Sequence, residues 1–237
     1  MEKSDEVYGM LSKGKDIVMK KLVIVGAGEF GDIAYEYFSF DSEYQVVAFA
    51  VEHQYRDADT KNGLPVIDFE EIEKVYPPDS YEVFVAITYV QLNRVRERLY
   101  LLCKEKGYKC ANYISSKTFV WRNVQVGENV FIFENSVLQH YVQVKNNVIV
   151  WSGTYIGHRS VINENCWIAP QCAIAGFCNV GANSFLGINS TIGDNVHIPK
   201  GTLLAAGAVT TKNLQQGESI YVGNPIRRIG GNPYNRF

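Results

Sequence analysis

The stretch VWSGTYIGHRSVINENCWIAPQCAIAGFCNV, residues 150–180, decides the fold, because an aliphatic residue stands at every sixth position. The same register continues on both sides. Its members are Ile114, Val120, Val126, Ile132, Leu138, Val144, Val150, Ile156, Ile162, Ile168, Ile174, Val180, Leu186, Ile192, Ile198 and Leu204. A period of six matches neither an amphipathic helix nor an open strand, so the chain must return to the same side after each short segment. We therefore predict a β-solenoid.

Two further positions of each hexad support this prediction. The position two residues before the aliphatic anchor holds a small or slim side chain, which fits the narrow interior of a triangular prism; examples are Val130, Ser136, Thr154, Cys166, Cys172, Cys178, Ser184 and Val196. Glycine often follows the anchor, as in Gly127, Gly157, Gly181, Gly187 and Gly193. We expect these glycines to supply the unusual backbone angles of tight corners.

Three hexads per turn place residues eighteen apart above one another, one strand spacing of about 4.8 Å away. One predicted corner column holds Arg122, His140, His158, Gly176 and Asp194. A second holds Glu134, Ser152, Pro170, Ile188 and Ala206. A row of large side chains, Phe131, Ile149, Trp167, Phe185 and Leu203, is too bulky for the interior. We expect that face to be covered by a symmetry-related copy of the chain.

Composition narrows the classes of function. The chain has 237 residues, 46% of them hydrophobic, and a net charge of −2 without a basic stripe, which argues against nucleic acid as a main partner. Its five cysteines are an odd number without a secretory signal, which favours a reducing, cytoplasmic location. Cys166, Cys172 and Cys178 are interpreted as core thiols rather than metal ligands. No apolar run is long enough for a membrane span, and no metal is expected.

Residues 20–113 alternate between predicted strands and helices, which indicates a small parallel sheet covered on both faces. Strands are expected at 22–25, 46–51, 65–67, 81–87 and 108–113, and helices at 32–39, 69–75 and 91–106. Arg94, Arg96 and Arg98 on the last helix are interpreted as a solvated face. The domain is too short for a usual dehydrogenase. We assign 1–19 to an extension, 20–113 to a Rossmann-like domain, 114–212 to the solenoid and 213–237 to a tail.

A glycine-rich turn follows the first strand of this domain. Gly26-Ala27-Gly28-Glu29-Phe30-Gly31 matches G-x-G-x-x-G between a strand and a helix. In that context backbone N–H groups approach a diphosphate at the helix N-terminus. Glu52 ends the second strand, where a ribose-binding acid is expected. We predict that Gly26, Gly28, Glu29, Phe30, Gly31 and Glu52 contact a nucleotide; the alternative is a tight turn with a solvated Glu52.

The hexads, the glycine-rich unit and the closing Gly223-Asn224-Pro225-Ile226-Arg227-Arg228-Ile229 together resemble the bacterial hexapeptide-repeat sugar acyltransferases. The resemblance is to the group that acetylates nucleotide-linked amino sugars and to its sialic acid O-acetyltransferase relatives. It implies an all-β left-handed parallel β-helix after the α/β Rossmann-like domain. It also implies a homotrimer with acetyl-CoA, or another acyl-CoA, in the groove between neighbouring helices.

The same resemblance implies roles for single residues. The family's general base lies in a segment similar to Ile156-Gly157-His158-Arg159-Ser160-Val161-Ile162, so the resemblance implies that His158 is the base. It also implies that the backbone N–H of Gly176 stabilises the developing oxyanion. An imidazole suits the removal of a proton from an attacking amine. His140, one coil earlier, is either a substrate contact or a spectator. The two remaining histidines, His53 and His197, are interpreted as surface residues.

Three positions depart from the family pattern. Arg159 stands where an acid often follows the base, Trp151 replaces a substrate-contacting Asn, and Trp167 replaces a His near the thioester. We expect Trp151 to line the sugar site and Trp167 the cofactor site, with a substrate different from the bacillosamine type. By the same comparison Ile188 and Ala206 line the pantetheine groove. The tail residues Asn224, Pro225 and Arg227 close over the adenine end.

Several functions stay open on the sequence alone. The first is an acyl-CoA-dependent N-acyltransferase acting on a nucleotide-linked deoxyamino sugar, with a sugar O-acetyltransferase as its close alternative. The second is a non-catalytic trimeric scaffold that binds nucleotide sugars, suggested by Trp151, Arg159 and Trp167. A solenoid metalloenzyme of carbonic-anhydrase type requires three converging histidines, and His140 and His158 supply only two from one chain.

Overall fold

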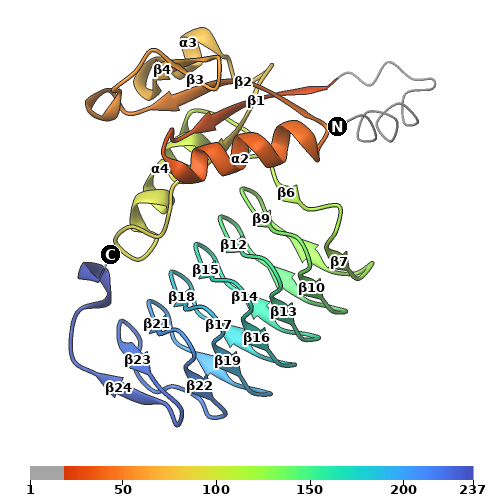
Figure 1. Cartoon of the computed structure of the whole chain (residues 1–237), viewed down its shortest axis with the longest axis vertical. Helices are drawn as coiled ribbons and strands as arrows, with labels where there is room; N and C mark the ends of the chain where they lie inside the picture. Colours follow the sequence, from red (N-terminus) through yellow and green to blue (C-terminus); the bar gives the residue numbers. More distant parts are fainter. Residues whose placement is uncertain (1–18, 237) are drawn as a thin grey trace, which may run out of the picture.

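The computed structural model describes residues 19–236, which form a small α/β domain joined to a coil of very short strands (Figure 1). The α/β domain contains β1 (Lys20–Val25), α2 (Glu29–Phe40), β2 (Tyr44–Val51), η1 (His53–Tyr55), β3 (Thr60–Lys61), β4 (Leu64–Asp68), η2 (Phe69–Glu71), α3 (Ile72–Val75), β5 (Glu82–Val85) and α4 (Arg94–Glu105). The sheet order is β3-β4-β2-β1-β5, parallel except for β3. Both faces are covered as predicted, because alternate residues of β1 belong to two different apolar clusters.

Two sequence predictions for this domain need correction. Residues 108–113 do not form a last strand, since only Cys110 bridges to Val83 and Tyr113 already belongs to the solenoid. The last helix begins at Arg94 rather than at residue 91. Gln91, Leu92 and Asn93 have φ angles of 50°, 51° and 68°, so the backbone turns through the left-handed region before the helix can start.

The rest of the chain is a parallel β-helix of two-residue strands. They are β6 (Tyr113–Ile114), β7 (Phe119–Val120), β8 (Gln125–Val126), β9 (Phe131–Ile132), β10 (Val137–Leu138), β11 (Gln143–Val144), β12 (Ile149–Val150), β13 (Tyr155–Ile156), β14 (Val161–Ile162), β15 (Trp167–Ile168), β16 (Ala173–Ile174), β17 (Asn179–Val180), β18 (Phe185–Leu186), β19 (Thr191–Ile192), β20 (His197–Ile198), β21 (Leu203–Leu204) and β22 (Val209–Thr210). Each pairs with the strand eighteen residues away, for example Val137 with Tyr155 and Tyr155 with Ala173. The eighteen-residue columns predicted from the sequence are therefore confirmed.

The prism has three faces, each one parallel sheet. We call the sheet of β6, β9, β12, β15, β18 and β21 the covered face, that of β7, β10, β13, β16, β19 and β22 the apolar open face, and that of β8, β11, β14, β17 and β20 the polar open face. The aliphatic anchors fill the interior together with Cys166, Cys172 and Cys178, which are 0–1% exposed. Burial raises the pKa of all three thiols, as expected for core residues.

The corners use a different residue from the one predicted. Left-handed backbone angles fall three residues after the anchor, mostly on asparagine, as in Asn147 (φ 58°) and Asn165 (φ 62°). The glycines directly after the anchor serve close packing instead. A Cβ on Gly187 would lie 2.5 Å from the backbone nitrogen of Ala206 in the next coil. These glycines therefore let successive coils approach one another.

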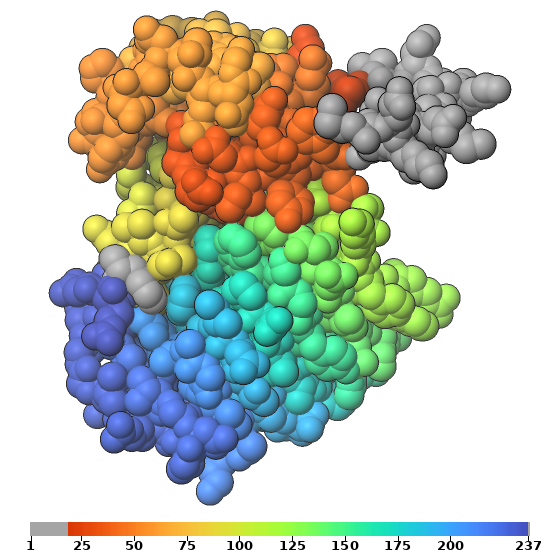
Figure 2. Space-filling view, in the orientation of Figure 1, coloured from red at the N-terminus to blue at the C-terminus, as the bar shows by residue number. Residues whose placement is uncertain are grey.

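The aromatic row is covered by the chain's own N-terminal domain, not by a second copy. Phe30 on α2 lies 5.7 Å from Phe131 and 5.4 Å from Trp167, ring centre to ring centre. Tyr89 packs edge-on against Trp167 and Phe185. Figure 1 shows α2 and α4 lying between the small sheet and this side of the coil. On the face that Figure 2 shows, the two parts lie directly against each other.

One corner of the prism is locked to the same domain by asparagines at eighteen-residue spacing. We call Asn129, Asn147, Asn165 and Asn183 the asparagine corner. Asn129 donates to Asn147 at 2.8 Å, and Asn147 donates to Asn165 at 2.9 Å. Glu97 on α4 accepts from the amides of Asn165 and Asn183. The ladder satisfies buried amides that would otherwise destabilise the junction.

Arg96 is buried in this junction rather than solvated. Its side chain is 0% exposed and donates to the Asn147 side chain and to the backbone oxygens of Asn147, Asn165 and Cys166. Its guanidinium also lies 5.4 Å from the Trp167 ring. Burial lowers the pKa of Arg96 to about 9, so it remains a cation at neutral pH. The interpretation as a solvated face was therefore wrong for Arg96, whereas Arg94 and Arg98 are exposed.

The tail was predicted to leave the prism, but it first adds one more strand to it. β23 (Ile220–Val222) adds to the covered face, β24 (Arg227–Ile229) pairs antiparallel with it, and η3 (Pro233–Asn235) ends the described chain. Arg94 of α4 stacks on Tyr234 at 3.4 Å, which returns the tail to the N-terminal domain. Within residues 19–236, no helix combines the length and apolarity needed to cross a membrane.

Candidate active site

The predicted histidine column exists as a corner between the apolar and polar open faces. We call His140, His158, Gly176 and Asp194 the histidine corner. The backbone nitrogens of Arg159, Phe177 and Asn195 donate to the oxygens of His140, His158 and Gly176, which fixes each residue one coil from the next. The corner therefore presents two imidazoles, a bare backbone and a carboxylate in a line.

The ring of His158 is held on three sides. It stacks on His140 with 5.2 Å between ring centres and 16° between planes, and Phe177 packs edge-on at 5.1 Å. On the remaining side lies Gly176, where an added Cβ would come within 2.6 Å of the His158 Cε1 atom. The residue is half-buried. This packing restricts the orientation of the imidazole, which a proton-transfer group requires.

Gln139 supplies the polar contact to this histidine. Its Oε1 atom lies 3.1 Å from the backbone nitrogen of His158 and 3.3 Å from the ring nitrogen Nδ1. Sequence reasoning missed Gln139, because nothing in the hexad pattern shows that its side chain reaches the next coil. Arg159 turns away, with its guanidinium 4.5 Å from the Tyr141 ring centre.

The Gly176 N–H is already engaged in this structure. It donates to Oδ1 of the exposed Asp194 side chain at 3.1 Å. The predicted oxyanion role of Gly176 therefore requires the carboxylate to give way when a substrate arrives.

The glycine-rich turn lines a cavity of about 280 Å³ at the carboxyl ends of β1 and β2. The turn contributes Gly26 and Gly28, and other lining residues include Glu52, Tyr55 and Ile87. Glu52 is held by Arg98 of α4 in a bidentate ion pair, both contacts 2.8 Å. Arg98 thus holds a lining residue of this cavity, a contact that the sequence did not reveal.

Two residues of the motif do not face the cavity. Phe30 is 2% exposed and packs into the domain junction, so its predicted contact with a nucleotide is wrong for the side chain. Gly31 is buried against the backbone oxygen of Gly26, which fits a role in close packing of helix on strand. Glu29 is exposed in the first turn of α2, outside the cavity lining.

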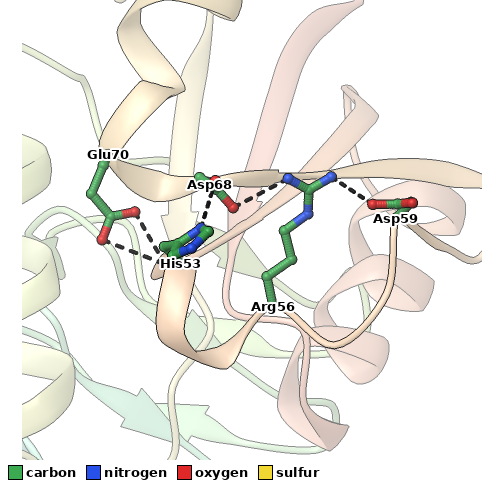
Figure 3. A network of polar contacts seen from close by, with 5 residues as sticks. All are labelled: His53, Arg56, Asp59, Asp68 and Glu70. Carbon is green, nitrogen blue, oxygen red and sulfur yellow. Dashed lines mark hydrogen bonds and ion pairs between the residues drawn. The ribbon is translucent and has the colours of Figure 1, made fainter.

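The loop beyond Glu52 is fixed by a polar network (Figure 3). Asp68 accepts from His53 Nδ1 at 2.9 Å and from Arg56 at 3.2 Å, and Glu70 accepts from the His53 backbone nitrogen. Arg56 also pairs with Asp59. The hydrogen bond from His53, followed by that from Arg56, lowers the pKa of Asp68. Asp68 therefore braces the cavity wall rather than capping the following helix.

Comparison with known proteins agrees with both halves of this description. Residues 21–101 match the model of the PglD N-terminal domain, and residues 109–220 match that of the GMPPB C-terminal domain. The acetyltransferase domain of PglB from Neisseria gonorrhoeae is similar over 89% of this chain and 100% of its own, with 23% identity and a TM-score of 0.80. PerB from Caulobacter crescentus, solved with CoA and GDP-perosamine, has 23% identity and a TM-score of 0.80 over 90% of this chain and 99% of its own.

The chain has the fold of the hexapeptide-repeat sugar acetyltransferases. WeeI from Acinetobacter baumannii shares it at 23% identity, with a TM-score of 0.64 over 89% of this chain and 100% of its own. The predicted Rossmann-like domain followed by a left-handed parallel β-helix is thus confirmed.

Both tryptophans pack at the junction between the N-terminal domain and the covered face. Trp151 stacks on Phe133 at 4.2 Å, and Trp167 is 3% exposed beneath the N-terminal domain. Both belong to the junction cluster with Phe30. Trp167 is buried beneath the N-terminal domain, which argues against its predicted contact with the cofactor. Trp151 is only partly buried, so its contact with the sugar stays a prediction.

A second corner carries the positions compared with the family's pantetheine groove. We call Glu134, Ser152, Pro170, Ile188 and Ala206 the isoleucine corner. Ile188 is 55% exposed and Ala206 is also exposed in the next coil, whereas Glu134 accepts from Ser152 and from Tyr37. Above this corner, a cavity of about 490 Å³ lies between α2 and the first coils. In the tail, Asn224, Pro225 and Arg227 are exposed.

Proposed function

We propose that this hexapeptide-repeat protein is an enzyme that transfers an acyl group, most simply acetyl, from acyl-CoA to the amino group of a nucleotide-linked deoxyamino sugar. The observation that carries the proposal is the fixed ring of His158 at an open corner of this fold, packed by His140, Phe177 and Gly176. The relatives support the substrates: PerB is described with CoA and GDP-perosamine, and the PglB domain with acetyl coenzyme A.

The proposed reaction is a direct transfer. The amine nitrogen attacks the thioester carbonyl while Nε2 of His158 takes its proton, and the carbonyl oxygen gains the negative charge. The Gly176 N–H stabilises that oxygen after Asp194 releases it. When the intermediate collapses, the carbon–sulfur bond breaks and the imidazolium returns the proton to the CoA sulfur. No other reactant is consumed.

The nucleotide is assigned to the cavity of Gly26, Gly28 and Glu52. Its backbone turn precedes the N-terminus of α2, where N–H groups favour a diphosphate. His140 stacks on the catalytic base His158 and is assigned to contact the sugar. Glu29 is the first residue of α2 and follows the lining residue Gly28, so it is assigned to contact the nucleotide from outside the cavity.

A homotrimer with acyl-CoA between neighbouring copies is supported by the two remaining corners. The apolar open face separates the histidine corner from the isoleucine corner and exposes Phe119 by 52% and Tyr155 by 40%. Its outward neighbours in the other coils include Val137, Ala173 and Val209. A second copy that covers this face brings Ile188 and Ala206 toward a neighbour's His158, and Asn224, Pro225 and Arg227 are assigned to the adenine end. The free buried thiols fit a cytoplasmic location.

The test is acetyl-CoA turnover on a panel of UDP-, dTDP- and GDP-linked amino sugars and their hydroxyl counterparts. Wild type, His158→Ala and the control His197→Ala, which changes an exposed residue of the polar open face, are compared with their oligomeric state measured. We expect turnover of an amino sugar, a loss of about 100-fold or more in His158→Ala, and none in the control.

Other outcomes identify the alternatives. Product formed only on a hydroxyl identifies an O-acetyltransferase. Binding of CoA and nucleotide sugar without turnover identifies a scaffold and contradicts the proposal. Among the described residues, no three His, Cys, Asp or Glu side chains come together around one point as metal ligands would, so no observation favours the metalloenzyme.

A further inference from the structure

We infer that Gln139 is the positioning residue of the site: its side-chain oxygen holds the proton of His158 on Nδ1 and thereby leaves the lone pair on Nε2 for the substrate. The inference rests on the proposed function for its catalytic meaning, but the tautomer itself is a property of the free protein. An acidic residue directly after the histidine could orient its ring, but here Arg159 stands at that position. The inference gives this task to Gln139, a neutral side chain of the preceding coil.

The identity of the Gln139 atom follows from the backbone. The amide group of Gln139 has an oxygen that accepts and a nitrogen that donates. The backbone N–H of His158 can only donate, and the Gln139 terminal atom lies 3.1 Å from it. That atom must therefore be the oxygen, because an NH₂ group would oppose one donor with another.

The tautomer of His158 follows from the same oxygen. It lies 3.3 Å from Nδ1, and a carbonyl oxygen can only accept. Nδ1 must therefore carry the hydrogen, and in the neutral ring Nε2 is then unprotonated. An imidazole held this way is ready to take a proton at Nε2 without first exchanging its own.

The charged and titratable groups around the ring do not compete for Nδ1. His140 stacks face to face on one side, which places its ring parallel to His158 rather than in line with a ring nitrogen. Arg159 lies over Tyr141, and Asp194 is occupied by the Gly176 N–H. Within residues 19–236, no carboxylate is hydrogen-bonded to the His158 ring. Arg122, the remaining charged member of the column, is exposed at its outer end.

Two substitutions separate positioning from mere packing. Gln139→Met keeps the length of the side chain but removes the acceptor, so the ring is free to take the other tautomer. Gln139→Glu keeps an acceptor at the same place and adds a negative charge that stabilises the protonated ring. Gln125→Met, an exposed position on the polar open face, is the matched control.

The kinetic readout is kcat/KM against pH, with KM for acetyl-CoA measured separately. We expect Gln139→Met to lose about 10-fold or more in kcat/KM with KM for acetyl-CoA nearly unchanged. Gln139→Glu should recover activity at high pH, with the midpoint of its profile displaced upward by about 1 pH unit or more. The control should follow wild type. Equal losses in both variants with an unmoved midpoint would overturn the inference, since that is what a packing role predicts.

A second readout needs no turnover. Ring ¹⁵N and ¹³C NMR of the free protein, with His158 assigned from a His158→Gln spectrum, reports which ring nitrogen is protonated at neutral to mildly alkaline pH. We expect a protonated Nδ1 and an unprotonated Nε2 in wild type, and loss of that preference in Gln139→Met. Protonated Nε2 in wild type would refute the positioning role even in an active enzyme. If the wild type turns over no acceptor but shows the Nδ1–H tautomer, only the proposed function fails.

Discussion

A Cβ atom on Gly176 would lie 2.6 Å from Cε1 and 2.9 Å from Nε2 of His158, so the imidazole rests directly against glycine backbone. Gly176→Ala must push the ring away, whereas its backbone angles need no glycine. We predict a fall in kcat/KM on the order of 10-fold or more with little change in thermal stability. Gly157→Ala is the contrasting variant, because its Cβ would meet the Ala175 backbone at 2.5 Å and should lower stability instead. Equal thermal destabilisation of the two would contradict this division.

Glu52 at the cavity rim provides a test of the nucleotide assignment. Glu52→Ala removes an acceptor beside the glycine-rich turn and releases Arg98. We expect KM for the nucleotide sugar to rise about 10-fold or more, with KM for acetyl-CoA unchanged, because the two ligands are assigned to different parts of the chain. Glu105→Ala, an exposed acid on the same helix as Arg98, should leave both constants alone. Isothermal titration with the bare nucleoside diphosphate checks the same point without chemistry.

Asp41 ties the end of α2 to the first coil. It accepts from the Tyr113 hydroxyl at 2.7 Å and from the Ser116 backbone at 3.0 Å. Burial by itself would raise the pKa of Asp41, but these hydrogen bonds outweigh it and lower the pKa below 3.8.

The stabilisation from Asp41 is therefore present above pH 3.8 and is lost as pH falls through the folded-state pKa. We predict that Asp41→Ala costs about 1 kcal/mol of unfolding free energy at pH 7 after solvent screening, and less in acid. Denaturant unfolding at several pH values, with Asp79→Ala as the exposed control, measures the difference. If the unfolding free energy lost in Asp41→Ala stays the same down to about pH 2–3, the assignment is contradicted.

Arg96 gives the largest predicted effect on stability. Arg96→Met fills similar space but leaves the backbone oxygens of Asn147 and Asn165 without their donor. We expect a loss of about 2–4 kcal/mol in denaturant unfolding. Arg94→Met, which removes an exposed stack on Tyr234, should cost less than about 1 kcal/mol. An unchanged unfolding free energy in Arg96→Met would mean that solvent replaces these hydrogen bonds, and it would contradict the prediction.

The sequence predicted which solenoid residues stack on one another better than it predicted which segments pack against them. With three hexads per turn, residues eighteen apart lie above one another, so the neighbourhood of His158 and Gly176 followed from counting. The same counting showed that Trp167 needed a cover but not which segment provides it. That choice depends on how α2 and α4 pack, which no local pattern records.

Single side chains escaped prediction for related reasons. An arginine on an amphipathic helix is ordinarily solvated, and only the carbonyls of a distant corner make Arg96 a buried residue. Gln139 stands at a position where several other hexads hold glycine, and its reach to the next coil depends on its rotamer. The burial of Trp167 was also missed, because the family pattern does not show that this side chain packs at the domain junction.

The central claim is that His158 is the base for an amine held by the N-terminal domain of the assembled protein. A crystal structure with CoA and an accepted nucleotide-linked amino sugar tests it most directly. We predict the sugar nitrogen within about 3 Å of Nε2 of His158, with the CoA sulfur on the isoleucine corner of a neighbouring copy. A sugar nitrogen farther from Nε2 than one bridging water spans, in a complex that turns over in solution, would contradict the claim.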